Sequence, residues 1–317
     1  MDGTSAESTD PLLFEKARAS QAGVRVVPGS LLRGLSVEGR WVDVDGTATF
    51  LLEGGRGPTI VLLHGGIPTG GVYWARMISR LENTRRVIVP DVPGQGISEP
   101  LANLDASTFA DWLTELLRLT CREEPILIAH SLVASLAARF AIHGGHLIRG
   151  LVLTGVPALG RWRPPPAFAV AAIRSSLRPS SRNTERFARW AFHDLDRTRQ
   201  TDREWFDAFL AYLRARGADP GVKRATRQLV RTATKRIPID ELRRIAVPTS
   251  LVWGRHDRMV TLRFAEAASA AIGWPLHVID DGGHVPFVEQ PDAFLDALAA
   301  VEKTLLRQPT HDPKEER

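Results

Sequence analysis

The amino-acid sequence predicts an α/β fold in which helices flank a mostly parallel central sheet. Three observations carry this prediction. Short runs rich in Val, Ile and Leu alternate with segments of ten or more residues that have helical periodicity, as in βαβ units. Loops rich in glycine and proline follow several of these runs. Finally, 44% of the 317 residues are hydrophobic and 24% are charged, a composition typical of a soluble protein with a large core.

Each expected strand is a short run dominated by aliphatic side chains. In chain order, the expected strands cover residues 47–52, 59–63, 86–90, 126–129, 151–154, 250–253 and 276–279. Each expected helix repeats apolar side chains every three or four positions. The expected helices cover residues 72–81, 106–119, 132–142, 262–272 and 293–306. This regular alternation predicts parallel strands joined by helical crossovers.

One long segment, residues 161–237, interrupts the alternation. It opens with Pro164-Pro165-Pro166, which cannot lie inside a helix, and it continues with three patches of helical spacing and no strand-like run. We therefore expect a helical insertion. The N-terminal region has one further helix-like stretch, at residues 12–19. The expected division is a core of residues 41–160 and 238–306, a helical insertion 161–237, a partly disordered extension 1–40 and a disordered tail 307–317.

Several classes of protein are excluded by what the sequence lacks. A single cysteine, Cys121, rules out a disulfide framework and a cysteine-based zinc site. No nucleotide-binding or zinc-binding motif is present, so we expect no cofactor and no metal. Residues 1–10 lack the features of a secretory signal, and the most apolar stretch, residues 126–142, is too polar to span a membrane. We expect a cytoplasmic protein that acts on a small molecule.

The central chemical signal is a serine between an expected strand and an expected helix. Ser131 follows the apolar run 126–129 directly after His130, and an alanine-rich helix leaves it. A serine on such a sharp turn projects its hydroxyl beyond the sheet edge, near the free N–H groups of the helix N-terminus. Small residues are needed on both sides, and Ala129 fits while Val133 is bulky. The same pattern also fits a buried strand that ends at a serine N-cap.

Three distant segments point to the same edge of the sheet. His64-Gly65-Gly66 follows an early strand, and such a loop can aim backbone N–H groups at an oxyanion. Asp257 follows a late strand, where α/β sheets place functional groups, although an aspartate there can also cap a helix. His284 follows the last strand after two glycines. The chain order is therefore Ser131, Asp257, His284, the order nucleophile, acid, base.

With these segments the sequence resembles the α/β-hydrolase superfamily over about residues 41–306. The stretch 91–98 matches its D-x-P-G-x-G-x-S loop, and residues 284–291 match its H-x-P-x-x-E-x-P tail. The resemblance implies an α/β-hydrolase fold, with the insertion as its lid. It also implies that Ser131 is the nucleophile, His284 the base and Asp257 the residue that orients the base.

The resemblance further implies an oxyanion hole made by two backbone N–H groups. One would come from Leu132. The other would come from Gly66, or from Ile67, which is an extra residue before Pro68.

The implied activity is hydrolysis of a carboxylic ester or lactone through an acyl-enzyme. The aromatic insertion favours a largely apolar substrate, with a pocket expected from Ile67, Trp190, Trp205, Phe209 and Val285. Three alternatives share the fold: a C–C bond hydrolase of ring-cleavage products, a cofactor-free haloperoxidase or perhydrolase, and a non-catalytic small-ligand receptor. C–C hydrolases of the superfamily tend to carry H-G-G-G-P-G and a tryptophan after the base, which this sequence lacks. Crowding by Val133 would favour the receptor.

The basic charge of the chain lies in the insertion. The whole chain carries +5. Residues 161–237 contain 18 Lys or Arg against 7 Asp or Glu, so they carry +11 and the remainder carries −6. A helical stripe of Arg224, Arg227, Arg231 and Lys235 is either a solvated face or a surface that steers anionic substrates. Because no nucleic-acid motif accompanies this charge, we expect no nucleic-acid partner; the oligomeric state stays open.

Overall fold

The computed structural model describes residues 27–307. The helix expected at residues 12–19 lies outside the described residues. Of the tail expected at 307–317, Arg307 is the last residue of a helix and residues 308–317 lie outside the described residues. The described part contains one eight-stranded sheet in the order β1-β2-β4-β3-β5-β6-β7-β8. The strands are β1 (Val37–Val44), β2 (Thr47–Gly54), β3 (Thr59–Leu63), β4 (Arg86–Pro90), β5 (Ile126–His130), β6 (Gly150–Thr154), β7 (Thr249–Gly254) and β8 (Leu276–Ile279). The pairs β1–β2 and β2–β4 are antiparallel and the other pairs are parallel.

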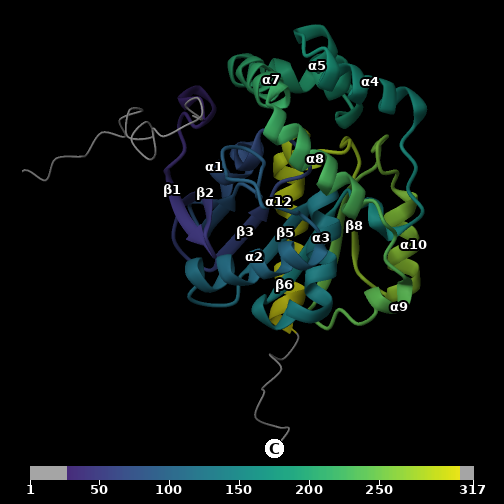
Figure 1. Cartoon of the computed structure of the whole chain (residues 1–317). Helices are drawn as coiled ribbons and strands as arrows, with labels where there is room; N and C mark the ends of the chain where they lie inside the picture. Colours follow the sequence, from purple (N-terminus) through teal and green to yellow (C-terminus); the bar gives the residue numbers. More distant parts are fainter. Residues whose placement is uncertain (1–26, 308–317) are drawn as a thin grey trace, which may run out of the picture.

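Helices cover both faces of this sheet (Figure 1). One face packs against α2 (Ala106–Thr120), α3 (Ser131–Gly144) and α10 (Arg263–Ile272), and the other packs against α1 (Ala75–Leu81) and α12 (Pro291–Arg307). Two short helices, α9 (Ile239–Leu242) and α11 (Pro286–Glu289), complete the core. Within β3, Val61 and Leu63 belong to the hydrophobic cluster on the face covered by α2, α3 and α10. Ile60 and Leu62 belong to the cluster on the face covered by α1 and α12. This alternation follows from the two-residue period of a strand. Across the described residues, no helix is long and apolar enough to cross a membrane.

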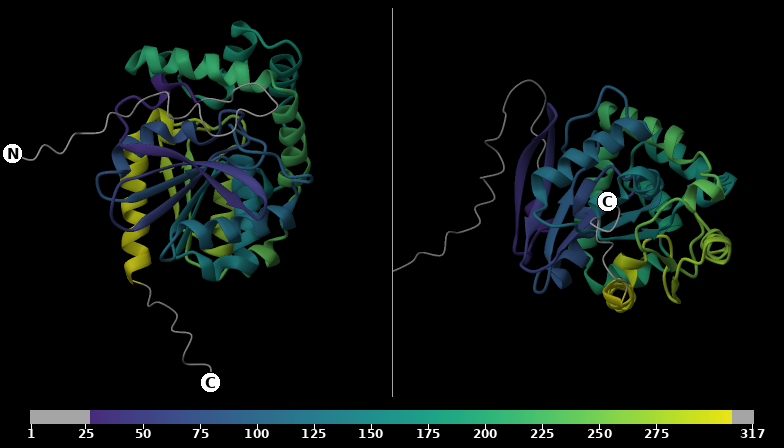
Figure 2. Two further views of the ribbon diagram at one scale, coloured as in Figure 1. Left: turned by 60° about the vertical axis from the view of Figure 1, so that its left-hand side comes forward. Right: turned by 90° about the horizontal axis from the view of Figure 1, so that it is seen from below.

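The helical insertion lies between β6 and β7 and contains no strand. Its helices are α4 (Pro166–Leu177), α5 (Ser181–Ala191), α6 (Leu195–Thr201), α7 (Arg203–Ala218) and α8 (Pro220–Ala233). Pro166 is the first residue of α4, a position where proline needs no N–H partner. Helices α4, α5 and α7 lie above one end of the sheet, and α8 descends along the core (Figures 1 and 2). Leu229 and Ala233 of α8 join the same hydrophobic cluster as α3.

The expected strands and long helices agree with the structure apart from three main differences, and the short helices α9 and α11 were not expected either. Five helices occupy the insertion where the sequence showed three patches. The helix expected at residues 72–81 begins as a 3₁₀ turn, Gly70–Trp74, before α1. Strand β1 was not expected, and it crosses the boundary drawn between residues 40 and 41.

The pattern of β1 is weak because it is an edge strand whose central residues are only partly buried. A local signal for it was nevertheless present. Asp45 and Gly46 both have positive φ, 48° and 79°, and they close the hairpin between β1 and β2. An Asp-Gly pair of this kind is a strong hairpin signal.

Candidate active site

Ser131 occupies the sharp turn between β5 and α3. Its φ of 55° lies in the left-handed region, which is uncommon for a residue with a side chain and marks local strain. The loop of Gly65 lies tightly against this turn: a Cβ on Gly65 would stand 2.5 Å from His130 Nδ1 and 3.1 Å from Ser131 Cβ. The strained turn places Ser131 beyond the carboxyl end of β5, as the sequence predicts.

A hydrogen-bond chain joins Ser131 to His284 and Asp257. His284 Nε2 lies 2.9 Å from Ser131 Oγ, and His284 Nδ1 lies 2.8 Å from Asp257 Oδ2. An ionised carboxylate can only accept, so Nδ1 carries the proton and Nε2 is left to accept from the serine hydroxyl. All three side chains are buried. The structure thus brings together the three residues that the sequence predicts at one edge of the sheet. Their arrangement is the one that general-base activation of a serine requires.

The Asp257 carboxylate is fixed by its own loop. Its second oxygen, Oδ1, accepts hydrogen bonds of 2.8 Å from the backbone N–H groups of Met259 and Val260. Asp257 therefore closes the turn that follows β7 while its other oxygen contacts His284. It does not cap the next helix, because α10 begins at Arg263 and its N-cap residue is Leu262.

The loop after β8 that carries His284 packs closely against its neighbours. A Cβ on Gly155, whose φ is +64°, would stand 2.7 Å from His284 Cε1, and one on Gly254 would stand 2.0 Å from the Gly283 carbonyl oxygen. His130 Nε2 donates to the His284 carbonyl oxygen at 2.8 Å. Burial lowers the pKa of His130 well below its usual value, so this histidine is neutral and acts as a fixed donor.

The helical insertion holds the same loop through Glu289. The Glu289 carboxylate accepts from the backbone N–H of Gly283 at 2.6 Å, of His193 at 2.7 Å and of Asp194 at 3.0 Å. His284 N–H also donates to the Ala191 carbonyl oxygen at 2.8 Å. Burial raises the pKa of Glu289 to about 7, although the three N–H bonds act in the opposite direction. The sequence showed Glu289 only as part of a family motif and gave no sign of this contact with the insertion.

The loop after β3 presents Gly66 to the serine turn. A Cβ on Gly66 would stand 2.5 Å from Leu132 Cδ1, so the two expected oxyanion donors belong to residues in direct contact. The Ile67 N–H donates to the Gly65 carbonyl oxygen at 2.7 Å and is thereby engaged within the loop.

The His64 ring joins this loop to the loop after β4 through two hydrogen bonds. Its Nε2 accepts from the Val92 N–H at 2.9 Å, which leaves the proton on Nδ1, 2.6 Å from the Gly65 carbonyl oxygen. Burial lowers the pKa of His64 to about 4, so the ring is neutral near pH 7.

Four of the five residues expected to line the pocket lie in or against one hydrophobic cluster: Ile67, Trp205, Phe209 and Val285. Phe209 stacks on Tyr73 with ring centroids 6.1 Å apart, and the Tyr73 ring lies 5.5 Å from His130. Tyr73 therefore connects the insertion to the serine turn, a role that the sequence did not indicate.

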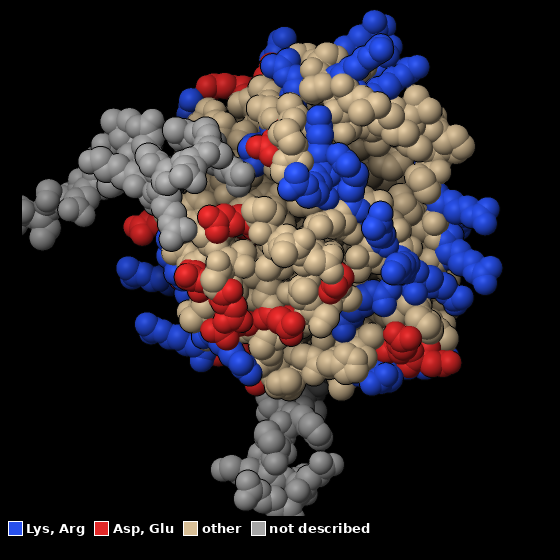
Figure 3. All heavy atoms as spheres, in the orientation of Figure 1, with Lys and Arg blue, Asp and Glu red and all other residues tan. Residues whose placement is uncertain are grey.

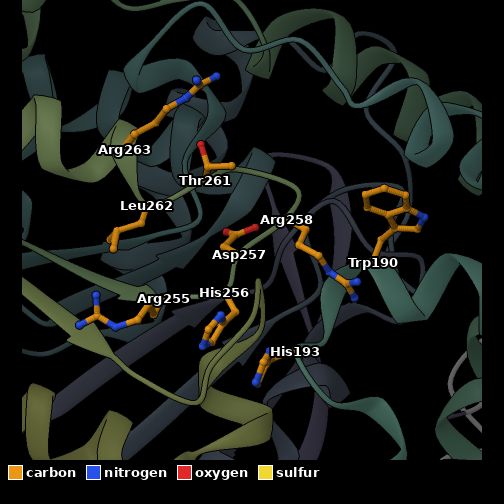
Figure 4. A pocket seen from close by; sticks show the side chains of 9 residues that line it. All are labelled: Trp190, His193, Arg255, His256, Asp257, Arg258, Thr261, Leu262 and Arg263. Carbon is orange, nitrogen blue, oxygen red and sulfur yellow. The ribbon is translucent and has the colours of Figure 1, made fainter.

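The fifth residue, Trp190, lies outside that cluster. It lines an open groove of about 700 Å³ beside the Asp257 loop, where the Arg258 guanidinium lies 5.7 Å from its ring centroid. Figure 4 shows the groove lining: Trp190, His193, Arg255, His256, Asp257, Arg258, Thr261, Leu262 and Arg263. Ser131 and His284 do not contribute to this lining. The rings of His193 and His256, both in this lining, stack with their centroids 3.9 Å apart.

We also searched the described part of the chain for clusters of side chains that could bind a metal ion. Between residues 27 and 307, no group of three or more His, Cys, Asp or Glu side chains could hold a metal ion.

Comparison with known proteins identifies relatives over most of the chain. The sequence model of the alpha/beta hydrolase family matches residues 60–297. A pimeloyl-[acyl-carrier protein] methyl ester esterase from Methylococcus capsulatus is 29% identical, and the match covers 75% of this chain and 92% of that one. A 2-hydroxy-6-oxo-2,4-heptadienoate hydrolase from Pseudomonas putida is 27% identical, with 83% and 96% covered.

A carboxylesterase structure from Bacillus subtilis superposes with a TM-score of 0.70 at 22% identity. The superposition covers 86% of this chain and 94% of the other, and at that identity it supports the fold alone.

Proposed function

Because the chain is a hydrolase that belongs to the alpha/beta hydrolase family, we propose that it is a serine hydrolase that cleaves a carboxylic ester or lactone of a largely apolar small molecule. The observation that carries this proposal is the hydrogen-bond chain from Ser131 through His284 to Asp257, with the serine on a strained turn. Backbone strain of this kind persists only where the surrounding structure holds the residue in place, and strained residues cluster at functional sites.

The geometry supports a two-step mechanism. Ser131 Oγ attacks the substrate carbonyl carbon while His284 Nε2 takes the hydroxyl proton, and Asp257 stabilises the imidazolium that forms. Collapse of the tetrahedral intermediate breaks the bond to the leaving alcohol, which receives the proton from His284. A water molecule then attacks the acyl-enzyme with His284 again as the base, and the carboxylic acid leaves as Ser131 recovers its proton.

We assign the two oxyanion donors to the backbone N–H groups of Leu132 and Gly66. Leu132 is the second residue of α3, where N–H groups have no partner within the helix and the helix dipole favours negative charge. Gly66 is preferred over Ile67 because the Ile67 N–H is already engaged by the Gly65 carbonyl oxygen. Two such donors, fixed before the reaction, stabilise the charge that develops on the carbonyl oxygen.

The aromatic inner face of the insertion supports an apolar substrate and a lid role for these helices. Trp205 and Phe209 are buried in the same hydrophobic cluster as Val285. Val285 directly follows His284 in the chain. Val133, whose bulk was the argument for a receptor, is fully buried, and the Ser131–His284 bond is nevertheless formed at 2.9 Å. This contact supports the enzyme over the receptor.

C–C bond hydrolysis is the second candidate, favoured by the similarity to the Pseudomonas putida hydrolase. The loop His64-Gly65-Gly66-Ile67 and the valine after His284 depart from the pattern expected for that activity. We therefore place ester or lactone hydrolysis first.

A fluorophosphonate probe together with p-nitrophenyl esters of increasing acyl length tests both candidates. We expect covalent labelling of Ser131 and ester turnover, and in Ser131→Ala a loss of labelling with a fall in hydrolysis of about 10³-fold or more. Ser135→Ala is the matched control, because Ser135 is a buried serine on the same helix whose hydroxyl only accepts from the Ala158 N–H. Absence of labelling would favour the receptor, and labelling without ester turnover would favour the C–C hydrolase.

A further inference from the structure

Helix α4 of the insertion exposes an aliphatic face. Val170 is 46% exposed, Ile173 57% and Leu177 75%, which places them among the few large exposed hydrophobic residues of the described chain. Their spacing of three and four residues puts all three on one side of the helix. Phe168 is the buried residue of α4, and its ring packs against Phe187 and Trp190. The side of the helix that carries Val170, Ile173 and Leu177 is therefore not used in packing against the described part of the molecule.

The segment that contains this face is rich in arginine. The segment 161–184 contains five arginines and no aspartate or glutamate, and all five are exposed: Arg161, Arg163, Arg174, Arg178 and Arg182. None of them forms an ion pair with another described residue, whereas Arg189, further along α5, is paired with Glu185 and Asp196. Within the part of the chain that the structure describes, no carboxylate pairs with the arginines around α4.

The position of α4 makes the face accessible. The helix packs against α5 and α7 and lies at the outer end of the insertion, away from the sheet (Figure 1). In the same orientation, Lys and Arg side chains project from that end of the molecule (Figure 3).

We propose that the α4 face docks on an anionic lipid surface. Val170, Ile173 and Leu177 enter the boundary between head groups and acyl chains, while Arg174, Arg178 and their neighbours contact lipid phosphates. A helix with aliphatic residues on one side and flanking arginines is suited to lying in the plane of a membrane interface. Guanidinium groups match phosphate oxygens in geometry as well as in charge.

The alternative of a second copy of the chain fits this face less well. Three partly exposed aliphatic side chains offer far less than the roughly 800 Å² per partner that a stable protein interface buries. A symmetric contact through α4 would also bring the arginines of one copy against those of the other, and like charges in contact oppose association. A lipid surface supplies an apolar layer for the aliphatic side chains and anionic groups for the arginines at the same time.

Flotation of the full chain with vesicles tests this proposal independently of the hydrolase assignment. The vesicles are phosphatidylcholine alone, or phosphatidylcholine with about one part in three of phosphatidylglycerol. We expect binding to the anionic vesicles, weaker binding at high salt, and little binding to the neutral ones. The triple variant Val170→Ser, Ile173→Ser, Leu177→Ser is expected to lose affinity by about tenfold or more, and each of Arg174→Glu and Arg178→Glu by about fivefold or more.

Two control variants separate this face from general hydrophobicity and charge. Leu119→Ser removes an aliphatic side chain that is 49% exposed on α2, and Arg227→Glu makes the same charge change on α8. Both are expected to bind more tightly than the α4 variants, and unchanged unfolding midpoints confirm that every variant is folded.

Equal binding by the triple variant and the wild type, or no preference for anionic vesicles, would overturn the proposal. A dimer in sedimentation that the triple variant abolishes would assign the face to self-association instead.

Discussion

Replacing Gly155 with alanine adds one methyl group beside the ring of His284. Gly155 follows β6 with a φ of +64°, and the new Cβ would stand 2.7 Å from His284 Cε1 and 3.0 Å from His284 Nδ1. Ordinary van der Waals contact begins at 3.4 Å, so the ring has to move by about 0.7 Å. His284 is held at 2.8 Å by Asp257 and at 2.9 Å by Ser131, and a movement of this size alters the geometry of these hydrogen bonds.

Two magnitudes follow from this contact. A side chain in the left-handed region costs about 1–2 kcal/mol of stability, which lowers the free energy of unfolding but leaves a folded protein. Displacing a reacting group by about 1 Å can cost on the order of 10²-fold in rate. We therefore expect Gly155→Ala to react with a fluorophosphonate about 10²-fold more slowly at Ser131.

Gly273→Ala is the matched control for the backbone cost. Gly273 ends α10 with a φ of +90°, and a Cβ there would meet nothing within 4 Å. This variant should lose a similar free energy of unfolding in urea while its labelling rate stays close to that of the wild type. If the two variants label at the same rate, the close packing of Gly155 against His284 does not position the base.

Two further predictions concern the groups around the base. Asp257→Asn removes the negative charge opposite the imidazolium and is expected to lower ester hydrolysis on the order of 10³- to 10⁴-fold; a loss of less than about tenfold in kcat/KM would contradict the role given to Asp257. Glu289 has a folded pKa of about 7 against an ordinary 4.5, so it contributes stability that is complete below about pH 4.5 and is lost as the pH rises through about 7. This corresponds to about 3 kcal/mol, and Glu289→Gln should remove it: the free energy of unfolding in urea should fall less between about pH 5 and pH 8 than in the wild type, and equal falls would refute the assignment.

Sequence patterns predicted most of the fold because the hydrophobic periodicity of a strand or helix is visible within a short stretch of sequence. The run 59–63 and the run 276–279 end where β3 and β8 end, since a change from aliphatic residues to glycine is visible within a few positions. Edge strand β1 was missed because its residues are only half buried and do not alternate clearly.

The candidate site was predictable to the extent that its residues directly follow strands. Ser131, Asp257 and His284 each lie just beyond a strand of a parallel sheet, so topology alone gathers them at one edge. The contacts of Glu289 with His193 and Asp194 join segments 95 or more positions apart. No local pattern encodes such a distance, and the stacking of Tyr73 on Phe209 was hidden for the same reason.

The hydrogen bonds that join Ala191, His193 and Asp194 to His284 and Glu289 have a consequence for how the sequence of this enzyme can vary. Helices that cover an active site are the natural place for changes in substrate selectivity, because their side chains vary without disturbing the sheet. Here residues 191–194 are joined through backbone groups to the peptide that carries His284. Insertions or deletions at that junction would shift the imidazole itself, whereas the ring contacts of α4 among the described residues are to Phe187 and Trp190 of α5. We expect length variation among homologues to concentrate around α4 and to be absent between α5 and α6.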